Sequence, residues 1–125
     1  MRLVLDTSIL VDLERGNKET INKLSELRRI YPDPPKISFI SYFEFLYGLR
    51  NKTFRNRKEP LEFVEKFDVI HTSKNTADIL VELKKKYEFP LADMMIASHT
   101  KEIKGVLVTK DRDFENMEEI EKIVL

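Results

Sequence analysis

Residues 1–12, MRLVLDTSILVD, are the stretch around which the rest of the chain is organised. Arg2–Leu5 is a short apolar run typical of a buried strand, and Asp6 follows it directly. Thr7 is a good helix N-cap, and the apolar residues of Ile9–Leu13 recur at helical spacing. A carboxylate at the carboxyl end of a parallel strand faces the crevice where α/β folds bind ligands. Asp6 therefore becomes informative if other carboxylates reach the same place.

The composition restricts the class of protein. A chain of 125 residues fits one domain, residues 1–125, with enough core to fold unaided. The 22 Lys and Arg balance 22 Asp and Glu, so nucleic-acid binding would have to use a local patch. The absence of cysteine excludes disulfides and thiolate metal sites. No apolar run is long enough to span a membrane, and a strand begins at residue 2 where a signal peptide would lie, so we expect a cytoplasmic protein.

Apolar periodicity along the rest of the chain predicts helices and strands in alternation. This order indicates an α/β fold, a three-layer α/β/α arrangement with a central, mostly parallel five-stranded sheet and right-handed crossovers. The expected helices are Asn17–Tyr31, one capped by Ser41, one through Leu61, Val64 and Phe67 with Pro60 at its first position, Ser73–Tyr87, and one beginning at Phe89 and ended by Gly105 as a C-cap. The expected strands are Lys36–Ile40, Asp68–His71, Val106–Thr109 and Ile120–Val124, the last at an edge.

Acidic residues recur at strand ends and helix starts. Glu44 and Asp93 are each expected in the first turn of a helix, where the ordinary role of an acid is to compensate the helix dipole. Glu44, however, lies in a helix that is apolar all round, and a buried carboxylate needs a partner. The late strand Val106–Thr109 runs into Asp111 and Asp113, which repeats the pattern of the opening stretch.

These acids predict a metal site if the first and fourth strands are neighbours where the strand order reverses. Four carboxylates in one crevice repel each other and raise each other's pKa unless a cation keeps them ionised. Oxygen ligands without Cys or an obvious His pair favour Mg²⁺ or Mn²⁺ over Zn²⁺. One or two such ions activate water and stabilise the charge of an in-line displacement at phosphorus.

Four segments of the sequence also resemble a known family. They are LVLDTSIL (3–10), ISFISYFEFLYGL (37–49), PLADMMIASHT (90–100) and GVLVTKDRDF (105–114), and they are similar to the four motif blocks of PIN-domain nucleases in order and spacing. The size and architecture resemble those of VapC-type toxins of toxin–antitoxin pairs. By this resemblance the acidic quartet is Asp6, Glu44, Asp93 and Asp111, the hydroxyl positions are Thr7 or Ser8 and Thr109, and Asp113 is a companion that acts as ligand or support.

The resemblance implies metal-dependent cleavage of RNA by an endoribonuclease that uses Mg²⁺ or Mn²⁺. It also implies a homodimer and inhibition by a small antitoxin whose extended tail enters the acidic groove, and the aromatic helix fits a protein-binding surface. Five basic residues are placed to guide RNA phosphates, although solubility explains each of them at least as well. They are Lys110 and Arg112 beside the acids, and Arg50, Arg55 and Arg57 in the basic stretch.

Three other interpretations remain open at this point. A stand-alone PIN nuclease of RNA processing would lack an antitoxin. A phosphoacceptor signalling domain would need adjacent acids after the first strand and an Asp at the end of the third, where this chain has Thr7 and His71. A non-catalytic binding module would keep the fold and use the aromatic helix as its interface. The remaining histidine, His99, is expected to face solvent or the edge of the site.

Overall fold

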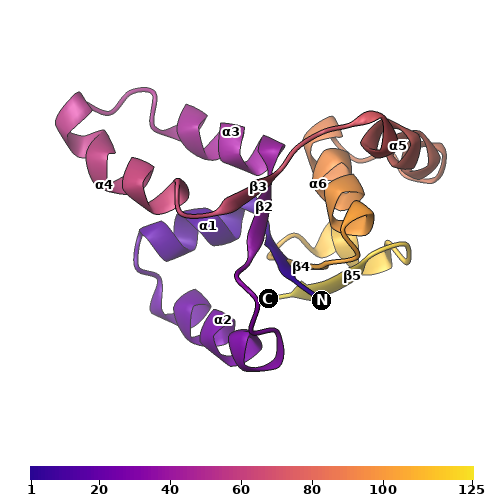
Figure 1. The fold of residues 1–125 in the computed structure, drawn as a ribbon, viewed down its shortest axis with the longest axis horizontal. Coiled ribbons are helices and arrows are strands. Elements are labelled where there is room, and N and C mark those ends of the chain that lie inside the picture. Colours follow the sequence, from indigo (N-terminus) through magenta and orange to yellow (C-terminus); the bar gives the residue numbers. More distant parts are fainter.

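The computed structural model describes all 125 residues and confirms the alternation of strands and helices (Figure 1). The first five helices each begin after a residue whose side chain caps the helix N-terminus. Asn17, for example, accepts a hydrogen bond from the amide of Thr20 and caps the second helix, as expected. The elements are β1 (Leu3–Leu5), α1 (Thr7–Glu14), α2 (Lys18–Ile30), β2 (Lys36–Ser38), α3 (Phe39–Gly48), α4 (Phe54–Val64), β3 (Asp68–Ile70), α5 (Lys74–Lys86), α6 (Leu91–Glu102), β4 (Val106–Thr109), the 3₁₀ helix η1 (Arg112–Asn116) and β5 (Glu121–Val124).

The sheet has the strand order β3-β2-β1-β4-β5, and every neighbouring pair is parallel. The first and fourth strands are therefore neighbours, with the chain continuing to one side from β1 and to the other from β4. This is the reversal of strand order that the acidic pattern required. The register pairs Leu3 with Val106 and Leu5 with Val108, so the two strands end at the same edge of the sheet.

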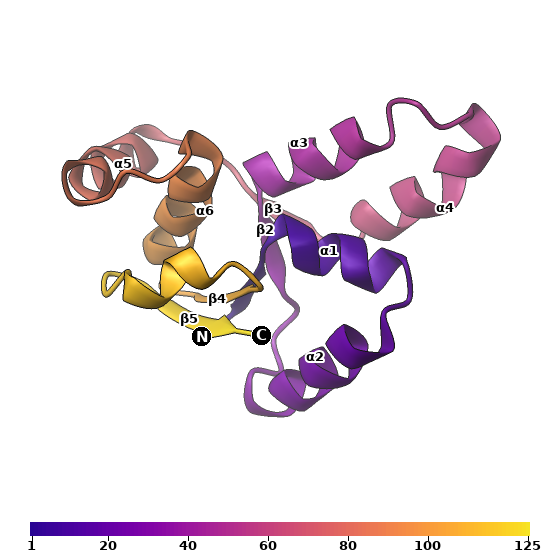
Figure 2. The ribbon, with the colours of Figure 1, turned by 180° about the vertical axis from the view of Figure 1, so that it is seen from behind.

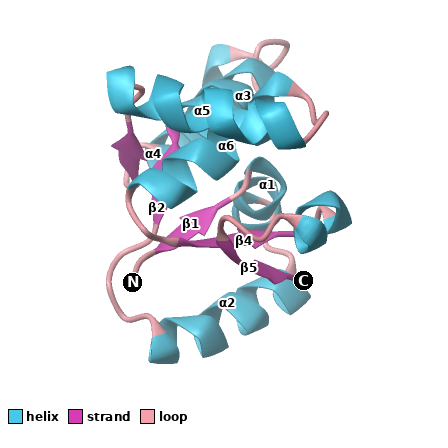
Figure 3. Cartoon of the chain, turned by 90° about the vertical axis from the view of Figure 1, so that its right-hand side faces the viewer, coloured by secondary structure: helices cyan, strands magenta, loops and turns pink.

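Helices cover both faces of the sheet because the side chains of its central strands alternate between two apolar cores. Leu3 and Leu5 point into a core shared with α1, α2, α3 and α4, whereas Val4 points into a second core with α5, α6 and η1. Figures 1 and 2 show these two groups of helices on opposite sides of the strands, and Figure 3 shows the strands enclosed between helices. No helix is long and apolar enough to cross a membrane.

The third helix begins earlier than expected. Ser38 ends β2 and caps α3, because its Oγ accepts a hydrogen bond from the amide of Ile40 at 3.2 Å. The predicted strand Lys36–Ile40 is thus two residues too long, and Ser41 lies inside the helix it was expected to cap. Glu44 consequently lies beyond the first turn, which holds no acid, so dipole compensation does not explain it.

The fourth helix also begins earlier, at Phe54, with Thr53 as its N-cap through a 3.3 Å hydrogen bond from the amide of Asn56. Pro60 lies inside α4 and is buried, whereas the sequence placed it at the first helical position. The helix loses only the single backbone hydrogen bond that proline cannot donate. The basic stretch before Pro60 was therefore wrongly separated from this helix.

Two capping predictions were wrong at opposite ends of the chain. Asp6, and not Thr7, caps α1 by accepting a 2.7 Å hydrogen bond from the Thr7 amide. Gly105 is not the C-cap of α6, because the helix ends at Glu102 with Ile103 as its C-cap, and Lys104 takes the left-handed conformation with φ 54°. Gly105 instead allows a close approach, since a Cβ there would lie 2.9 Å from the carbonyl oxygen of Arg2.

Candidate functional site

The candidate site lies at the carboxyl edge of the sheet, where β1 and β4 end side by side. The Asp6 amide continues the pairing by donating to the carbonyl of Val108 at 3.0 Å. The helices α1 and α3 begin at this edge because they follow β1 and β2 directly, and α6 begins here because it runs back to the start of β4 (Figure 1). Acids from strand ends and from helices are thereby directed to one place.

Asp6 is the most buried acid of this group, with 7% of its surface exposed. Its Oδ2 accepts a hydrogen bond from the Thr109 hydroxyl at 2.6 Å, across β1 and β4. Burial raises the pKa of Asp6, the hydrogen bonds from Thr109 and the Thr7 amide oppose that rise, and the carboxylates of Glu44 and Asp111 add to it. The hydroxyl of Thr109 thus steadies a carboxylate that burial and its neighbours disfavour.

Glu44 is joined to this group through Thr7. The Thr7 hydroxyl donates to Oε1 of Glu44 at 2.7 Å and lies 3.1 Å from the hydroxyl of the buried Ser41. Of the two hydroxyl residues considered after Asp6, Thr7 makes this contact, whereas Ser8 is exposed. The contact links the first turn of α1 to the middle of α3 and holds the Glu44 carboxylate toward the end of β1.

Asp93 lies in the first turn of α6, and its pKa is raised more than that of any other acid of this group. Burial and the nearby carboxylates of Asp111, Asp6, Glu44 and Asp113, in that order, raise the pKa of Asp93 to about 6. No hydrogen bond opposes this rise, in contrast to Asp6. The pKa of Asp93 thus reports that acids from four parts of the chain lie within electrostatic reach of one another.

The acids after β4 are held by the backbone of a tight turn. The Asp111 amide donates to the Thr109 hydroxyl at 3.0 Å, and Oδ1 of Asp111 accepts from the Asp113 amide at 2.9 Å. Asp111 therefore caps η1 and is partly buried, while Asp113 is exposed at the rim. The hydroxyl of Thr109 connects both strand ends, because it donates to Asp6 and accepts from Asp111.

The donor set fits a hard divalent cation in its chemistry. The acids and the two threonines of this group offer carboxylate and hydroxyl oxygens, which Mg²⁺ and Mn²⁺ prefer. Burial first, and then the neighbouring carboxylates, raise the pKa of Asp93, and such a cation relieves the repulsion among these carboxylates. No three acidic or histidine side chains stand close enough together to form a ready coordination shell. The residues therefore match a metal site in kind but are not assembled around one.

A sequence model of the PIN domain matches residues 3–120, which is nearly the whole chain. The chain belongs to the PIN domain family. No curated protein sequence matches it.

Solved structures share the fold of this PIN domain over its full length. A chain of VapBC2 from Rickettsia felis bound to a promoter DNA fragment has a TM-score of 0.84 at 23% identity, covering 100% of this chain and 99% of that one. A toxin–antitoxin complex from Klebsiella pneumoniae gives 0.79 at 24% identity, with 94% of each chain covered. DNA-bound VapBC from Salmonella typhimurium gives 0.75 at 26% identity, covering 99% of this chain and 98% of that one.

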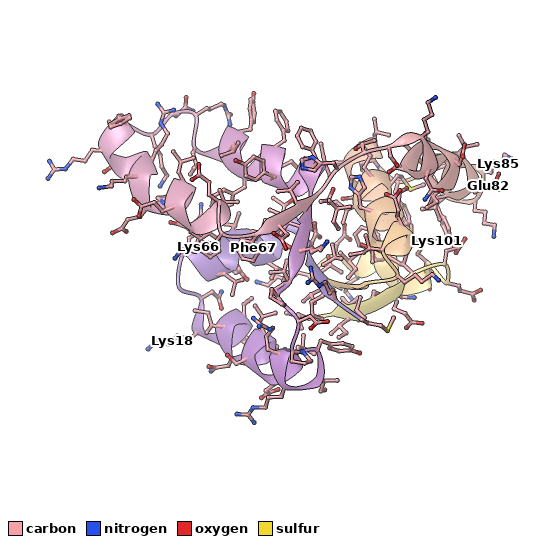
Figure 4. All side chains as sticks on the ribbon, viewed as in Figure 1. Lys18, Lys66, Phe67, Glu82, Lys85 and Lys101 are labelled. Atoms are coloured by element: carbon pink, nitrogen blue, oxygen red, sulfur yellow. The ribbon has the colours of Figure 1, made fainter.

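Two of the expected RNA-contacting cations of the PIN domain lie beside the acids and are already paired. Lys110, directly before Asp111, forms an ion pair with Asp12 of α1. Arg112 lies 3.4 Å from Glu115 within η1 and is largely exposed. Lysines such as Lys18 and Lys85, by contrast, extend from the periphery, far from this edge of the sheet (Figure 4).

The other three expected cations belong to the α3–α4 pair, which projects from the sheet (Figures 1 and 2). Arg50 stacks on Tyr47, with its guanidinium carbon 4.0 Å from the ring centroid, just after α3. Arg55 and Arg57 lie in the first turn of α4, which begins at the outer end of this pair (Figure 1). The structure therefore does not bring these three residues together with the acids.

The structure contains a buried polar contact, formed by His99, that was not predicted from the sequence. His99 is fully buried, so the expectation that it faces solvent or the edge of the site was wrong. Its Nδ1 lies 2.7 Å from the hydroxyl of Ser38, and its Nε2 lies 3.3 Å from the hydroxyl of Thr72. No local pattern predicts this contact, because the partners of His99 are 61 and 27 residues away in the chain. The short polar run Ser98–Thr100 after the apolar stretch Met94–Ala97 was the only signal.

Proposed function

We propose that this PIN domain, as one unit over residues 1–125, is a Mg²⁺- or Mn²⁺-dependent endoribonuclease and the toxin of a VapBC-type toxin–antitoxin pair in the cytoplasm. One observation carries the nuclease proposal, namely the convergence of Asp6, Glu44, Asp93 and Asp111 from four separate segments onto one edge of the sheet. Membership of the PIN domain family supports it, since PIN domains are generally nucleases.

Each acid takes a role from its surroundings. Asp6, Glu44 and Asp93 hold the cation, directly or through water, because they are wholly or partly buried and the cation relieves their mutual repulsion. Asp111 supports a second cation or orients the attacking water, and Asp113 supports it from the rim. Thr7 and Thr109 keep two of these carboxylates in place through the hydrogen bonds described above.

When bound, one or two such ions supply an activated water and stabilise negative charge on the scissile phosphate. The protein contributes fixed carboxylates in a partly desolvated place and basic side chains nearby. Lys110 is the cation that stands beside the acids, and its ion pair with Asp12 holds it there in the absence of RNA. When RNA binds, Lys110 exchanges Asp12 for an RNA phosphate, and this contact makes the affinity for RNA sensitive to salt.

A cleavage assay on single-stranded RNA tests the nuclease proposal. We expect cleavage with Mg²⁺ or Mn²⁺, none in excess EDTA, and loss of at least about 100-fold in the Asp6→Asn, Asp93→Asn double variant. Asp78→Asn is the matched control, because Asp78 is an exposed acid on α5, remote from the site in sequence and unlinked to it. Cleavage that survives EDTA or the double substitution would refute the mechanism.

The toxin assignment is supported by the fold shared with chains of VapBC complexes. It predicts a small partner protein encoded beside this one, with an apolar, Arg-bearing tail that enters the acidic groove. We expect expression of the chain alone to arrest growth and co-expression of that neighbour to restore it, with a stable complex on gel filtration. Growth that is unaffected, with an active enzyme and no such neighbour, would instead favour a stand-alone nuclease of RNA processing.

The proposed homodimer uses the exposed aromatic face of α3. Phe39, Phe43 and Tyr47 lie one turn apart and are 43%, 49% and 54% exposed, which is unusual for large apolar side chains. Phe43 and Tyr47 stack with ring centroids 5.8 Å apart, so the face is rigid as well as apolar. Sedimentation should show a dimer that Phe43→Lys converts to a monomer with an unchanged far-ultraviolet spectrum. A wild-type monomer at high concentration would contradict this proposal.

A further inference from the structure

The buried ring of His99 joins the two helices that carry Glu44 and Asp93. The ring belongs to α6, six residues after Asp93, and its Nδ1 partner Ser38 caps α3 six residues before Glu44. At 1.5 Å per helical residue, each acid lies about 9 Å along its helix from this junction. His99 and Ser38 are both 0% exposed, so no water competes for their contact. The other ring nitrogen, Nε2, contacts the hydroxyl of Thr72, which follows β3.

The hydrogen-bond donors and acceptors of this junction determine the proton position on the ring. Oγ of Ser38 already accepts from the amide of Ile40, and its own proton is free to be donated. Ser38 has no other acceptor for that proton, so we assign it to a hydrogen bond with Nδ1 of His99, which makes Nδ1 the unprotonated nitrogen. Nε2 carries the remaining proton and donates it to Thr72. With this assignment a neutral imidazole in the Nε2–H form uses both ring nitrogens and the proton of Ser38.

We propose that His99 is a positioning residue of the nuclease, which sets the spacing between the helices of Glu44 and Asp93 through its contact with Ser38. This inference rests on the proposed function, because it assumes that these two acids act together. A group that holds catalytic side chains needs well-satisfied contacts to rigid elements, and His99 has such a contact with Ser38 at the end of β2 and a second one with Thr72 in the connection after β3. A displacement of about 1 Å at such a site costs up to about 100-fold in rate.

Three substitutions separate the two arms of the ring. His99→Asn places a carbonyl oxygen near the position of Nδ1 and retains an acceptor for Ser38. His99→Gln reaches the position of Nε2 and retains only the contact with Thr72, while His99→Leu fills the space and retains neither. The control is Thr100→Val, which removes a buried hydroxyl on the same helix whose 2.8 Å hydrogen bond goes to the carbonyl of Ile96 in α6 itself.

We expect kcat to fall by about 10- to 100-fold in His99→Leu and His99→Gln and by less than about 5-fold in His99→Asn, because only the asparagine variant keeps the link between the helices. KM for RNA should stay within about 2-fold, since the basic residues that contact phosphate are untouched. Mn²⁺ affinity measured by calorimetry should fall in the same order as kcat. Thr100→Val should lower the melting temperature and leave kcat and Mn²⁺ affinity at wild-type values.

Imidazole nitrogen NMR of the wild-type protein provides a readout that is independent of catalysis. We expect the Nε2–H form at neutral pH, with a protonated Nδ1 overturning the assignment. Equal kcat values for the three His99 variants, or an equal loss in Thr100→Val, would reduce His99 to a structural residue and overturn the inference alone. A wild-type protein without metal-dependent cleavage would overturn the proposed function itself, which separates the two failures.

Discussion

Replacing Asp93 with asparagine should stabilise the metal-free protein at neutral pH. Burial and the surrounding carboxylates raise the pKa of Asp93 from 3.8 to about 6, so its ionised form opposes folding. At about 1.4 kcal/mol for each pKa unit, the ceiling for this penalty is about 3 kcal/mol. The carboxylate is partly exposed and therefore screened, so we expect a gain of about 1–2 kcal/mol, or roughly 3–8 °C in melting temperature.

The sign of the effect depends on pH in a defined way. The pKa of Asp93 is higher in the folded state, so the folded protein binds the extra proton between pH 3.8 and about 6. The destabilisation by Asp93 is thus absent below pH 3.8 and complete above about pH 6. The advantage of Asp93→Asn should accordingly shrink as pH falls through this interval. Added Mn²⁺ should reverse the order at neutral pH, because it stabilises the wild type by about 2.7 kcal/mol at 100 times its Kd.

Urea unfolding of both proteins in EDTA, at about pH 7 and about pH 4, measures these differences. Asp78→Asn serves as the control, because this acid is exposed on α5 and should leave stability unchanged at both pH values. An Asp93→Asn protein no more stable than the wild type at neutral pH would refute the reasoning, since burial and the neighbouring carboxylates would then not disfavour the ionised form of Asp93.

Three further predictions concern Thr109 in the site, Gly105 at the start of β4 and the buried His99. Thr109→Val removes the hydroxyl that donates to the buried Asp6 carboxylate and should lower the free energy of unfolding by about 1–3 kcal/mol at neutral pH, as measured in urea. Gly105→Ala should cost about 1–3 kcal/mol, because its Cβ would lie 2.9 Å from the carbonyl oxygen of Arg2 and from a methyl group of Val4. Gly48→Ala, whose Cβ would have no neighbouring atom within 4 Å, should be neutral or stabilising in the same urea experiment. Burial lowers the pKa of His99 below 6.5, so the free energy of unfolding of the wild type should fall relative to that of His99→Asn as the pH falls below about 6.5. A difference between the two proteins that does not change with pH, measured by urea unfolding, would contradict this.

The order of the strands and helices could be predicted from the sequence, because apolar periodicity and capping residues are properties of short segments. The strand before Asp6 is marked by its own apolar run. The helices that follow Asn17 and Ser73 are each marked by an apolar period and a capping residue. The predicted metal site depended on the first and fourth strands being neighbours where the strand order reverses, and the strand order fulfils that condition. Boundaries were predicted less well where two capping residues compete, as at Ser38 and Ser41.

The contacts within the site could not be read in the same way, because each joins residues that are far apart in the chain. The sequence alone determined that acids follow two apolar strands and occur in two helices, and it named Thr7 and Thr109 only through a family resemblance. Which hydroxyl reaches which carboxylate, and the burial that raises the pKa of Asp93, were decided by the packing of α3 and α6 over the sheet edge.

His99 shows this division most clearly. In sequence it is one polar residue near the end of a helix, where exposure is the ordinary expectation. In the folded protein it is fully buried, because Ser38 and Thr72 arrive from other elements and satisfy both of its nitrogens. Local propensities therefore determined the elements and the residues that bear the chemistry, while long-range packing decided which of those residues are desolvated and with which partners.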